Sequence, residues 1–278
     1  MTPASSLGRG RLADGGNLVG AIEDSMFAWC DVPGFVRPLR VPGLRGGVSS
    51  SANPYANRVG ADGLSAERAD ATIRHLIATF EEDGKGFTWV VGPRSTPGDL
   101  STRLTRAGVV PAEALAGMAL RDLARPGGAD PPVSVRTATR SDLRHYAAAM
   151  AACYGMPTET MRDANAFLLH EANDYRTRVF LAFAPGTAEP VAFGTVVLFH
   201  GPRLALLGGS GTHPDHRGRG LYRALLRRRL DEARTAGCEA ALVQADRRTS
   251  APILARVGFE ELCDIRMHAW QPSGAPAT

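Results

Sequence analysis

The stretch that most constrains this chain is HPDHRGRGLY, which runs from His213 to Tyr222. An apolar run (204–207) precedes it, and a helical pattern (221–236) follows it. A strand, a basic glycine-rich turn and a helix in this order form an anion site, because the first N–H groups of a helix lack partners and the helix dipole is positive there. The glycines let the backbone approach a phosphate closely. We therefore expect a ligand that carries a diphosphate.

The composition is that of an ordinary globular protein. The 278 residues are 44% hydrophobic, enough for one large core or two medium ones. Net charge is only +4. The chain has one Lys (Lys85) and thirty-one Arg, and it is rich in Ala, Gly and Pro. This composition indicates a coding bias rather than nucleic-acid binding. No run approaches the roughly eighteen apolar residues of a membrane span, and no charged-then-apolar leader is present. We expect a cytoplasmic protein with no nucleic-acid or membrane partner.

Cysteine spacing excludes two further classes. Cys30, Cys153, Cys238 and Cys263 are far apart and form no C-x-x-C pair. Neither a zinc site nor a disulfide framework has this spacing, so we expect reduced thiols and no metal.

The sequence predicts two domains. Within residues 124–132, Pro and Gly residues that interrupt helices and strands lie on both sides of a short polar segment. We therefore assign 126–132 as a linker. The predicted lobes are 17–125 and 133–271, and the Pro, Gly, Ser and Ala-rich tails at 1–16 and 272–278 are expected to be disordered.

After the linker the pattern reads β-α-α-β-β-β-α-β-α-β. Ser141 is the expected cap of the first helix, which runs toward Gly155, and Ser250 is the expected cap of the last, which ends at Gly258. The expected strands are 133–138, 179–183, 191–198, 204–210, 240–245 and 262–270, and the other helices are 158–172 and 221–236.

This order, together with Arg217-Gly218-Arg219-Gly220-Leu221-Tyr222, resembles the GNAT superfamily of N-acetyltransferases, whose hallmark is R/Q-x-x-G-x-G/A after a strand. The short final helix that ends in Gly258-Phe259 and the position of Pro214 fit the same family. The resemblance covers residues 133–271 and implies the GNAT fold there.

The first half resembles a second copy of the same fold. Phe87 to Val109 repeats the strand–helix ending of residues 242–259, but residues 40–80 contain no R-x-x-G-x-G turn. We therefore expect a mixed α/β fold of two tandem GNAT-like lobes, each a mostly antiparallel twisted sheet flanked by helices. The first lobe would be degenerate: a scaffold, or alternatively a contributor to the acceptor pocket.

The resemblance implies acetyl-CoA as co-substrate. Its diphosphate would bind the backbone N–H groups of Arg217, Gly218, Arg219, Gly220, Leu221 and Tyr222. The pantetheine amides would pair with the strand edge at Gly211, Thr212 and His213, where family members have a bulge that Gly208, Gly209 and Gly211 would suit. A backbone N–H of this strand would polarise the thioester carbonyl.

Arginines are concentrated around this turn. Residues 201–235 contain eight Arg and three acidic residues. Arg223, Arg227, Arg228 and Arg229 either attract the anionic coenzyme or form a solvated helix face. We favour the solvated face for Arg228 and Arg229, and both interpretations stay open for Arg223.

The proton-transfer residues are less determined. Family members often carry a Tyr five residues before the Phe of the Gly-Phe ending, but here that position is Leu254. Tyr222 and Ser250 are candidate donors, with core packing and helix capping as their alternatives. His213 is the candidate base, beside His200 and Asp246. Acceptor recognition is sought among Tyr146, Tyr154, His170 and Tyr175.

These inferences combine into one expected function. The chain would be an acetyl-CoA-dependent N-acetyltransferase, an acyltransferase that acts on a small primary amine by direct attack in a ternary complex, as a monomer or homodimer. The alternative is a non-catalytic acyl-CoA sensor that has lost its donor Tyr. Nucleic-acid binding by the Arg-rich helix is disfavoured, because net charge is small and no recognition motif is present.

Overall fold

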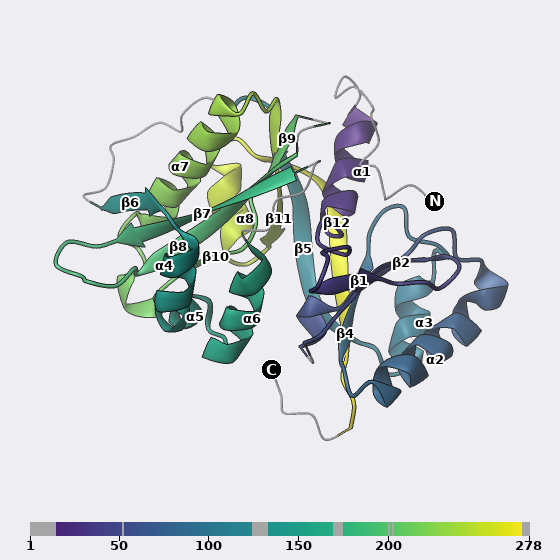
Figure 1. Cartoon of the computed structure of the whole chain (residues 1–278). Coiled ribbons are helices and arrows are strands. Elements are labelled where there is room, and N and C mark those ends of the chain that lie inside the picture. The colour runs from purple at the N-terminus through teal and green to yellow at the C-terminus, as the bar shows by residue number, and fades with distance from the viewer. Residues whose placement is uncertain are drawn as a thin grey trace. The chain divides into compact units, whose positions relative to one another are not determined.

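A computed structural model describes residues 15–51, 53–123, 133–168, 175–199, 201 and 203–273. The predicted linker (126–132) lies outside the described residues, as do 1–14 and 274–278 of the predicted tails. Figure 1 shows the helices and strands of the described residues.

The described chain divides into two compact units. The N-terminal unit comprises the described residues of Gly15–Met118, Gln244–Arg256 and Glu261–Thr278, and the C-terminal unit comprises those of Ala119–Val243 and Val257–Glu260. These units differ from the continuous stretches 17–125 and 133–271, because the last strand of the chain belongs to the sheet of the N-terminal unit. The linear boundaries stay a prediction about the two related lobes.

The elements of the N-terminal unit are α1 (Gly15–Ser25), β1 (Val36–Pro38), β2 (Leu44–Ser49), a 3-10 turn (Pro54–Ala56), β3 (Arg58–Ala61), α2 (Ala66–Glu82), β4 (Phe87–Val91), α3 (Leu100–Arg106), β5 (Val110–Leu120), α8 (Ser250–Ala255) and β12 (Glu260–Trp270). Strand order in its sheet is β1-β2-β3-β4-β12-β5. The β3–β4 pair is parallel, whereas β1–β2, β2–β3 and β4–β12 are antiparallel.

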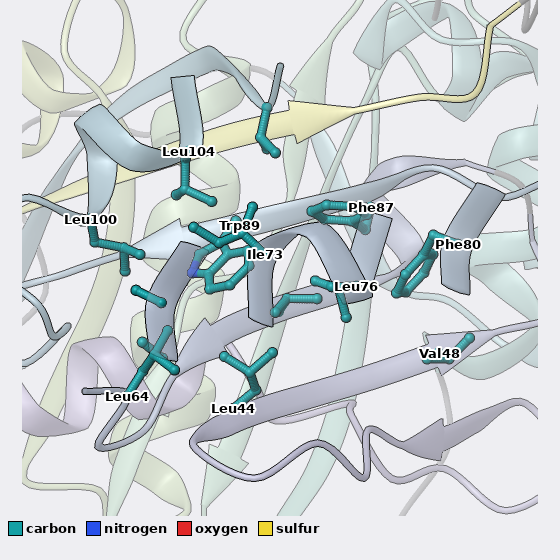
Figure 2. Packing of buried hydrophobic residues seen from close by; sticks show 14 residues of the cluster. Leu44, Val48, Leu64, Ile73, Leu76, Phe80, Phe87, Trp89, Leu100 and Leu104 are labelled. Carbon is teal, nitrogen blue, oxygen red and sulfur yellow. The ribbon is translucent and has the colours of Figure 1, made fainter. Parts of the chain in front are cut away.

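Aromatic packing explains why β12 lies beside β4. In the antiparallel register Trp270 lies opposite Phe87, and their rings stack with centroids 5.7 Å apart. Phe87 also contacts Phe80 of α2 at 5.0 Å and Trp89 at 6.5 Å, measured between ring centroids. The same core contains apolar residues of β2, β3, α2 and α3 (Figure 2). Pairing with β4 therefore places Trp270 against an aromatic core that residues 80–89 already form.

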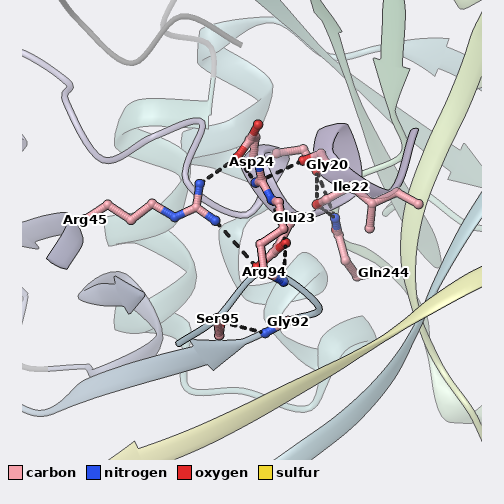
Figure 3. Close-up of polar contacts among 10 residues, drawn as sticks. Gly20, Ile22, Glu23, Asp24, Arg45, Gly92, Arg94, Ser95 and Gln244 are labelled. Atoms are coloured by element: carbon pink, nitrogen blue, oxygen red, sulfur yellow. Dashed lines mark hydrogen bonds and ion pairs between the residues drawn. The ribbon is translucent and has the colours of Figure 1, made fainter. Parts of the chain in front are cut away.

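A buried carboxylate links α1 to this sheet. The Glu23 side chain is 2% exposed; its Oε2 accepts a hydrogen bond from Arg94 Nε at 2.9 Å, and its Oε1 lies 3.7 Å from Arg45 Nη2. Asp24 binds the same two arginines (Figure 3). Gln244 Nε2 donates to the carbonyl of Ile22 at 2.9 Å. Because every charge in the network is paired, α1 tolerates an ionised residue in its buried face.

The elements of the C-terminal unit are β6 (Ser134–Thr137), α4 (Arg140–His145), α5 (Ala147–Tyr154), α6 (Thr158–Leu168), β7 (Tyr175–Phe183), β8 (Ala192–Phe199), β9 (Leu204–Leu206), β10 (Ser210–Thr212), a 3-10 turn (Pro214–His216), α7 (Leu221–Thr235) and β11 (Ala240–Asp246), whose last residues are assigned to the other unit. Strand order is β11-β9-β8-β7-β6, with β10 paired to β8. The β9–β11 pair is parallel, and the other pairs are antiparallel.

Helices cover both faces of this sheet. A Cβ on Gly211 would lie 2.6 Å from the carbonyl oxygen of Cys153 in α5, whereas a Cβ on Gly194 would lie 3.2 Å from Arg229 Cζ in α7. Gly194 pairs with Ser210, the strand neighbour of Gly211. Successive residues of a strand point to opposite faces, so α5 and α7 lie on opposite sides.

The two units repeat one pattern, as the sequence predicts. In chain order, a strand, a helix and a parallel strand occur twice (β3-α2-β4 and β9-α7-β11), and each set is followed by a short helix, α3 or α8, the latter assigned to the N-terminal unit. Gly108 and Gly258 follow these short helices with φ of 85° and 101°, each before a buried hydrophobic residue. The expected mixed fold of two related lobes is confirmed.

Three details differ from expectation. The first helix is capped by Thr139, not Ser141, because Thr139 forms a reciprocal capping box with Asp142. Ser250 is the first helical residue of α8 rather than its cap, which is Thr249. The predicted strand 204–210 is divided into β9 and β10. Among the described residues, no helix is both long and apolar enough to cross a membrane.

The Glu23 network predicts a stability effect. Glu23→Gln should lower the free energy of unfolding by about 1 to 3 kcal/mol, since the buried position 23 loses its ionic contacts to Arg94 and Arg45, which then keep only Asp24. Urea denaturation measures the change. Glu261→Gln is the control, because it breaks the more exposed pair with Arg247 and should cost at most about 1 kcal/mol. Equal losses of unfolding free energy in the two variants would show that burial does not strengthen the contribution of the Glu23 pair to stability.

Candidate functional site

The candidate site begins where β9 ends. Leu206 of β9 pairs with Leu242 of β11, and Leu207 N donates to Leu242 O at 2.8 Å. Beyond that bond the strand breaks at Gly208 and Gly209, and in the described part of the chain β10 pairs with β8 only. One edge of β10 therefore lacks a strand partner. The glycines singled out for a bulge lie at this break.

The register identifies the residues that face the open edge. Thr195 N donates to Gly209 O at 3.1 Å, and His213 N donates to Val191 O at 2.8 Å. Backbone groups of an antiparallel strand alternate in direction, so residues 209, 211 and 213 point toward β8. Ser210 and Thr212 then direct their N–H and C=O groups to the open edge. Of the predicted pantetheine-binding residues, only Thr212 has this direction; Ser210 has it too and was not predicted.

The polar turn after β10 is built by local hydrogen bonds. His213 begins the 3-10 turn, and its Nδ1 accepts a hydrogen bond from Asp215 N at 3.3 Å. Arg217 Nε donates to the Thr212 carbonyl at 3.3 Å, which ties the turn back to the strand. Asp215 and His216 thus act as turn residues.

The start of α7 is arranged as an anion site. Gly218 and Gly220 have φ of 75° and 81°, a conformation that residues with a Cβ rarely adopt. Gly220 is the N-cap, and no side chain of the described residues caps the first turn of α7. The first N–H groups of the helix are thus left to water or a ligand. Arg217 and Arg219 are exposed beside them and supply positive charge.

Of the two arginines of α7 that were expected on a solvated face, Arg228 is exposed and Arg229 is not. Arg227 is 3% exposed and Arg229 1% exposed. Arg228 is on the surface as expected, where its Nη2 lies 3.9 Å from a Glu232 carboxylate oxygen. Spacing alone could not distinguish these neighbours, because their burial depends on which face of α7 meets the sheet. Arg223 is exposed near the helix start.

The proton-transfer candidates have different surroundings. His213 is at the end of β10, with 36% of its side chain exposed. Tyr222 is half-buried in the first turn of α7, and the centroid of its ring is 5.7 Å from Arg229 Cζ. Ser250 belongs to the N-terminal unit, and its role stays a prediction. Asp246 accepts hydrogen bonds from Thr249 and Arg248, which lower its pKa and make it a poor base.

The aromatic candidates for acceptor binding also differ in their surroundings. Tyr154 of α5 is 49% exposed, and its ring lies 3.6 Å from the position of a Cβ on Gly209, at the strand break. Tyr146 packs against Phe183 and Tyr175 is buried, so both belong to the core. His170 and His200 lie outside the described residues.

A family comparison agrees with this geometry. Residues 144–259 match the model of the acetyltransferase (GNAT) family. The matched segment contains β10, the glycine turn and α7, and it ends at the Gly258-Phe259 pair that the sequence singled out. The resemblance to this family is confirmed.

Solved structures show the same fold over most of the chain. A GCN5-related N-acetyltransferase from Kribbella flavida is 19% identical, with a TM-score of 0.62, and the match covers 86% of this chain and 91% of that one. A tandem GNAT protein from the clavulanic acid biosynthesis pathway is 15% identical, with a TM-score of 0.60 and coverage of 94% and 89%. A GCN5-related N-acetyltransferase from Sphaerobacter thermophilus is 18% identical, with a TM-score of 0.57 and coverage of 84% and 79%. No curated protein matches the chain.

The contact between β10 and α5 predicts a sensitive position. Gly211→Ala should lower the free energy of unfolding by about 1 to 3 kcal/mol, because the added Cβ meets the Cys153 carbonyl at 2.6 Å. Calorimetry of the purified variant measures the loss. Gly201→Ala is the matched control, since no atom lies within 4 Å of its Cβ position. An unchanged melting temperature for Gly211→Ala would show that β10 can move away from α5.

Proposed function

We propose that this protein, whose residues 144–259 form a domain of the acetyltransferase (GNAT) family, is an acetyl-CoA-dependent N-acetyltransferase that acts on a small-molecule primary amine. The observation that carries the proposal is the uncapped start of α7 directly after a strand with one open edge. The first suits a diphosphate and the second suits a ligand with amide groups.

The residues present fit the coenzyme. In the part of the chain that the structure describes, nothing lies within 4 Å of a Cβ position on Gly218, so the turn is open on that side. Arg217, Gly218, Arg219, Gly220, Leu221 and Tyr222 would hold the diphosphate through backbone N–H groups and two guanidinium charges. The N–H groups of Ser210 and Thr212 would take pantetheine and thioester oxygens. When bound, acetyl-CoA supplies the acetyl group.

Direct transfer to the amine is supported by the cysteine next to the site. Cys153 lies behind β10, and burial raises the pKa of its thiol to about 11, against a small opposing effect of the His213 backbone. It is protonated near neutral pH and does not serve as a nucleophile. The amine nitrogen would form its bond to the thioester carbon as the carbon–sulfur bond breaks.

Two protons then have to move. His213 is the proposed base for the amine proton, because its ring is partly exposed at the end of β10 and Nδ1 already accepts from Asp215 N. Tyr222 is the proposed donor to the departing thiolate, and Ser250 is the other candidate. Tyr154 is the proposed acceptor contact, since it faces the strand break from α5.

The coenzyme is proposed to bind the C-terminal unit only. The matching turn before α2 contains Gly63 with φ of 75°, but the residue before it is the acidic Asp62 and no basic residue lies between Gly60 and Glu67. Glu67 lies in the first turn of α2, and hydrogen bonds from its own backbone and from Ser65 lower its pKa. This carboxylate opposes a diphosphate at that helix start.

Nucleic-acid binding is disfavoured by the burial of Arg227 and Arg229 and by the proximity of Arg228 to Glu232. A sensor that binds acyl-CoA without turnover is the second candidate function. It is favoured by Leu254, which is fully buried where family members often carry a donor Tyr. Thiol release measured with a panel of primary amines decides between the two. Coenzyme binding without release from any amine would favour the sensor.

Coenzyme binding predicts a thermal shift. Acetyl-CoA at about 100 times its dissociation constant should stabilise the wild type by about 2.7 kcal/mol, which raises the melting temperature. Gly218→Asp with Gly220→Asp should abolish the shift, because two carboxylates would repel the diphosphate. Gly63→Asp is the matched control at the equivalent turn and should keep it. No shift in the wild type would refute the coenzyme assignment.

The donor role of Tyr222 predicts a separate loss. Tyr222→Phe should lower kcat about 100-fold, because the phenol proton is gone, while the dissociation constant for CoA stays the same. Steady-state thiol release and calorimetry measure the two quantities. Tyr146→Phe, in the core, should retain wild-type kcat. A kcat within twofold of wild type for Tyr222→Phe would assign that residue to packing.

A further inference from the structure

Arg229 is a buried cation without a carboxylate. It lies on α7 two helical turns beyond the anion site and is 1% exposed. No acidic side chain among the described residues forms an ion pair with it. Burial lowers the pKa of its guanidinium, an effect that the Tyr222 phenol partly offsets. An unpaired buried charge costs several kcal/mol, so its position calls for a physical reason.

Two of its hydrogen bonds go to backbone carbonyls, and its charge also interacts with the Tyr222 phenol. Nε donates to Leu225 O of the preceding helical turn at 3.3 Å, and Nη1 donates to Gly208 O at 3.5 Å. Nη2 has no hydrogen-bond partner among the described residues. Gly208 is the first residue of the break between β9 and β10. The guanidinium therefore links α7 to the point where the strand leaves its partner.

The sheet is shaped to admit this side chain. A Cβ on Gly194 would lie 3.2 Å from Arg229 Cζ and 3.3 Å from Ser210 Cβ. Both contacts are tighter than ordinary van der Waals distance. Only glycine at 194 leaves room for the guanidinium under β8 and β10 without displacing it. Arg229 is nearly inaccessible to solvent. It therefore contacts the strand break from the α7 side of the sheet and does not contact a ligand.

The two carbonyls that flank Ser210 are thereby occupied. Gly208 O is bonded to Arg229, and Thr212 O is bonded to Arg217. Ser210, between them, keeps its N–H toward the open edge. A thioester oxygen is attracted by N–H groups and repelled by carbonyl oxygens, so drawing the two flanking carbonyls toward guanidinium groups weakens their repulsion and leaves the Ser210 carbonyl as the acceptor beside the Ser210 N–H.

We propose that Arg229 is a positioning residue that holds the Gly208 carbonyl toward α7, so that the Ser210 N–H is aimed at the thioester oxygen. The inference rests on the proposed function, and it assigns to Arg229 the orientation of the donor rather than contact with the substrate. A guanidinium suits this role because it can donate to the Leu225 and Gly208 carbonyls at once.

The test compares Arg229→Met, Arg229→Lys and the control Arg228→Met. Methionine fills a similar volume without charge, and replacing a buried ion by an apolar group is often neutral for stability, so the variant should fold. We expect kcat for thiol release to fall about tenfold or more in Arg229→Met, with an unchanged dissociation constant for CoA, which lacks the thioester. Arg229→Lys keeps a donor and should recover most of kcat. Arg228→Met should resemble the wild type.

A second measurement does not depend on turnover. Hydrogen–deuterium exchange of the peptide that spans residues 204–212 should be faster in Arg229→Met than in wild type, and unchanged in Arg228→Met. Wild-type exchange and kcat in Arg229→Met would overturn the proposal. Loss of CoA binding together with kcat would assign Arg229 to general stability of the unit. If the wild type shows no turnover at all, the proposed function fails, while the exchange data still decide whether Arg229 holds the break.

Discussion

The break between β9 and β10 is the feature on which the proposed site depends. A strand that continued through Gly208 and Gly209 would pair with β11 along its whole length and leave no backbone donor free. Instead, pairing stops after Leu207, and β10 stays attached through β8. A sheet normally satisfies its backbone groups internally. In β10, by contrast, one short strand edge keeps its backbone groups available to a ligand.

The helix after the turn, α7, contributes positive charge to the same site. The uncapped N–H groups of α7 and the exposed side chains of Arg217 and Arg219 concentrate positive potential at one point. Arg229 is too deep in the same helix to add to this surface potential, and its contacts are to the sheet. One helix thus serves both parts of the site, its first turn for charge and its buried face for the strand break.

The N-terminal unit repeats the topology without the chemistry. Its parallel strand pair and intervening helix match those of the other unit, but Glu67 occupies the helix start where the C-terminal unit has arginine. Its core is aromatic and takes in the last strand of the chain through Trp270 and Phe87. The ion network of Glu23 fastens α1 to the same sheet. These features suit a stable scaffold.

Local sequence determined much of this protein: the glycines at 218 and 220, the helix after them, the repeat of strand and helix, and the glycines at the strand break all follow from residue type and short spacing. Tertiary structure alone decided that Ser210, not Gly211 or His213, faces the open edge, because direction along a strand depends on pairing with β8. It also decided that Arg229 is buried while Arg228 is exposed, and that the final strand joins the sheet of the N-terminal unit. Those outcomes depend on contacts between residues far apart in the chain, and no local pattern encodes them.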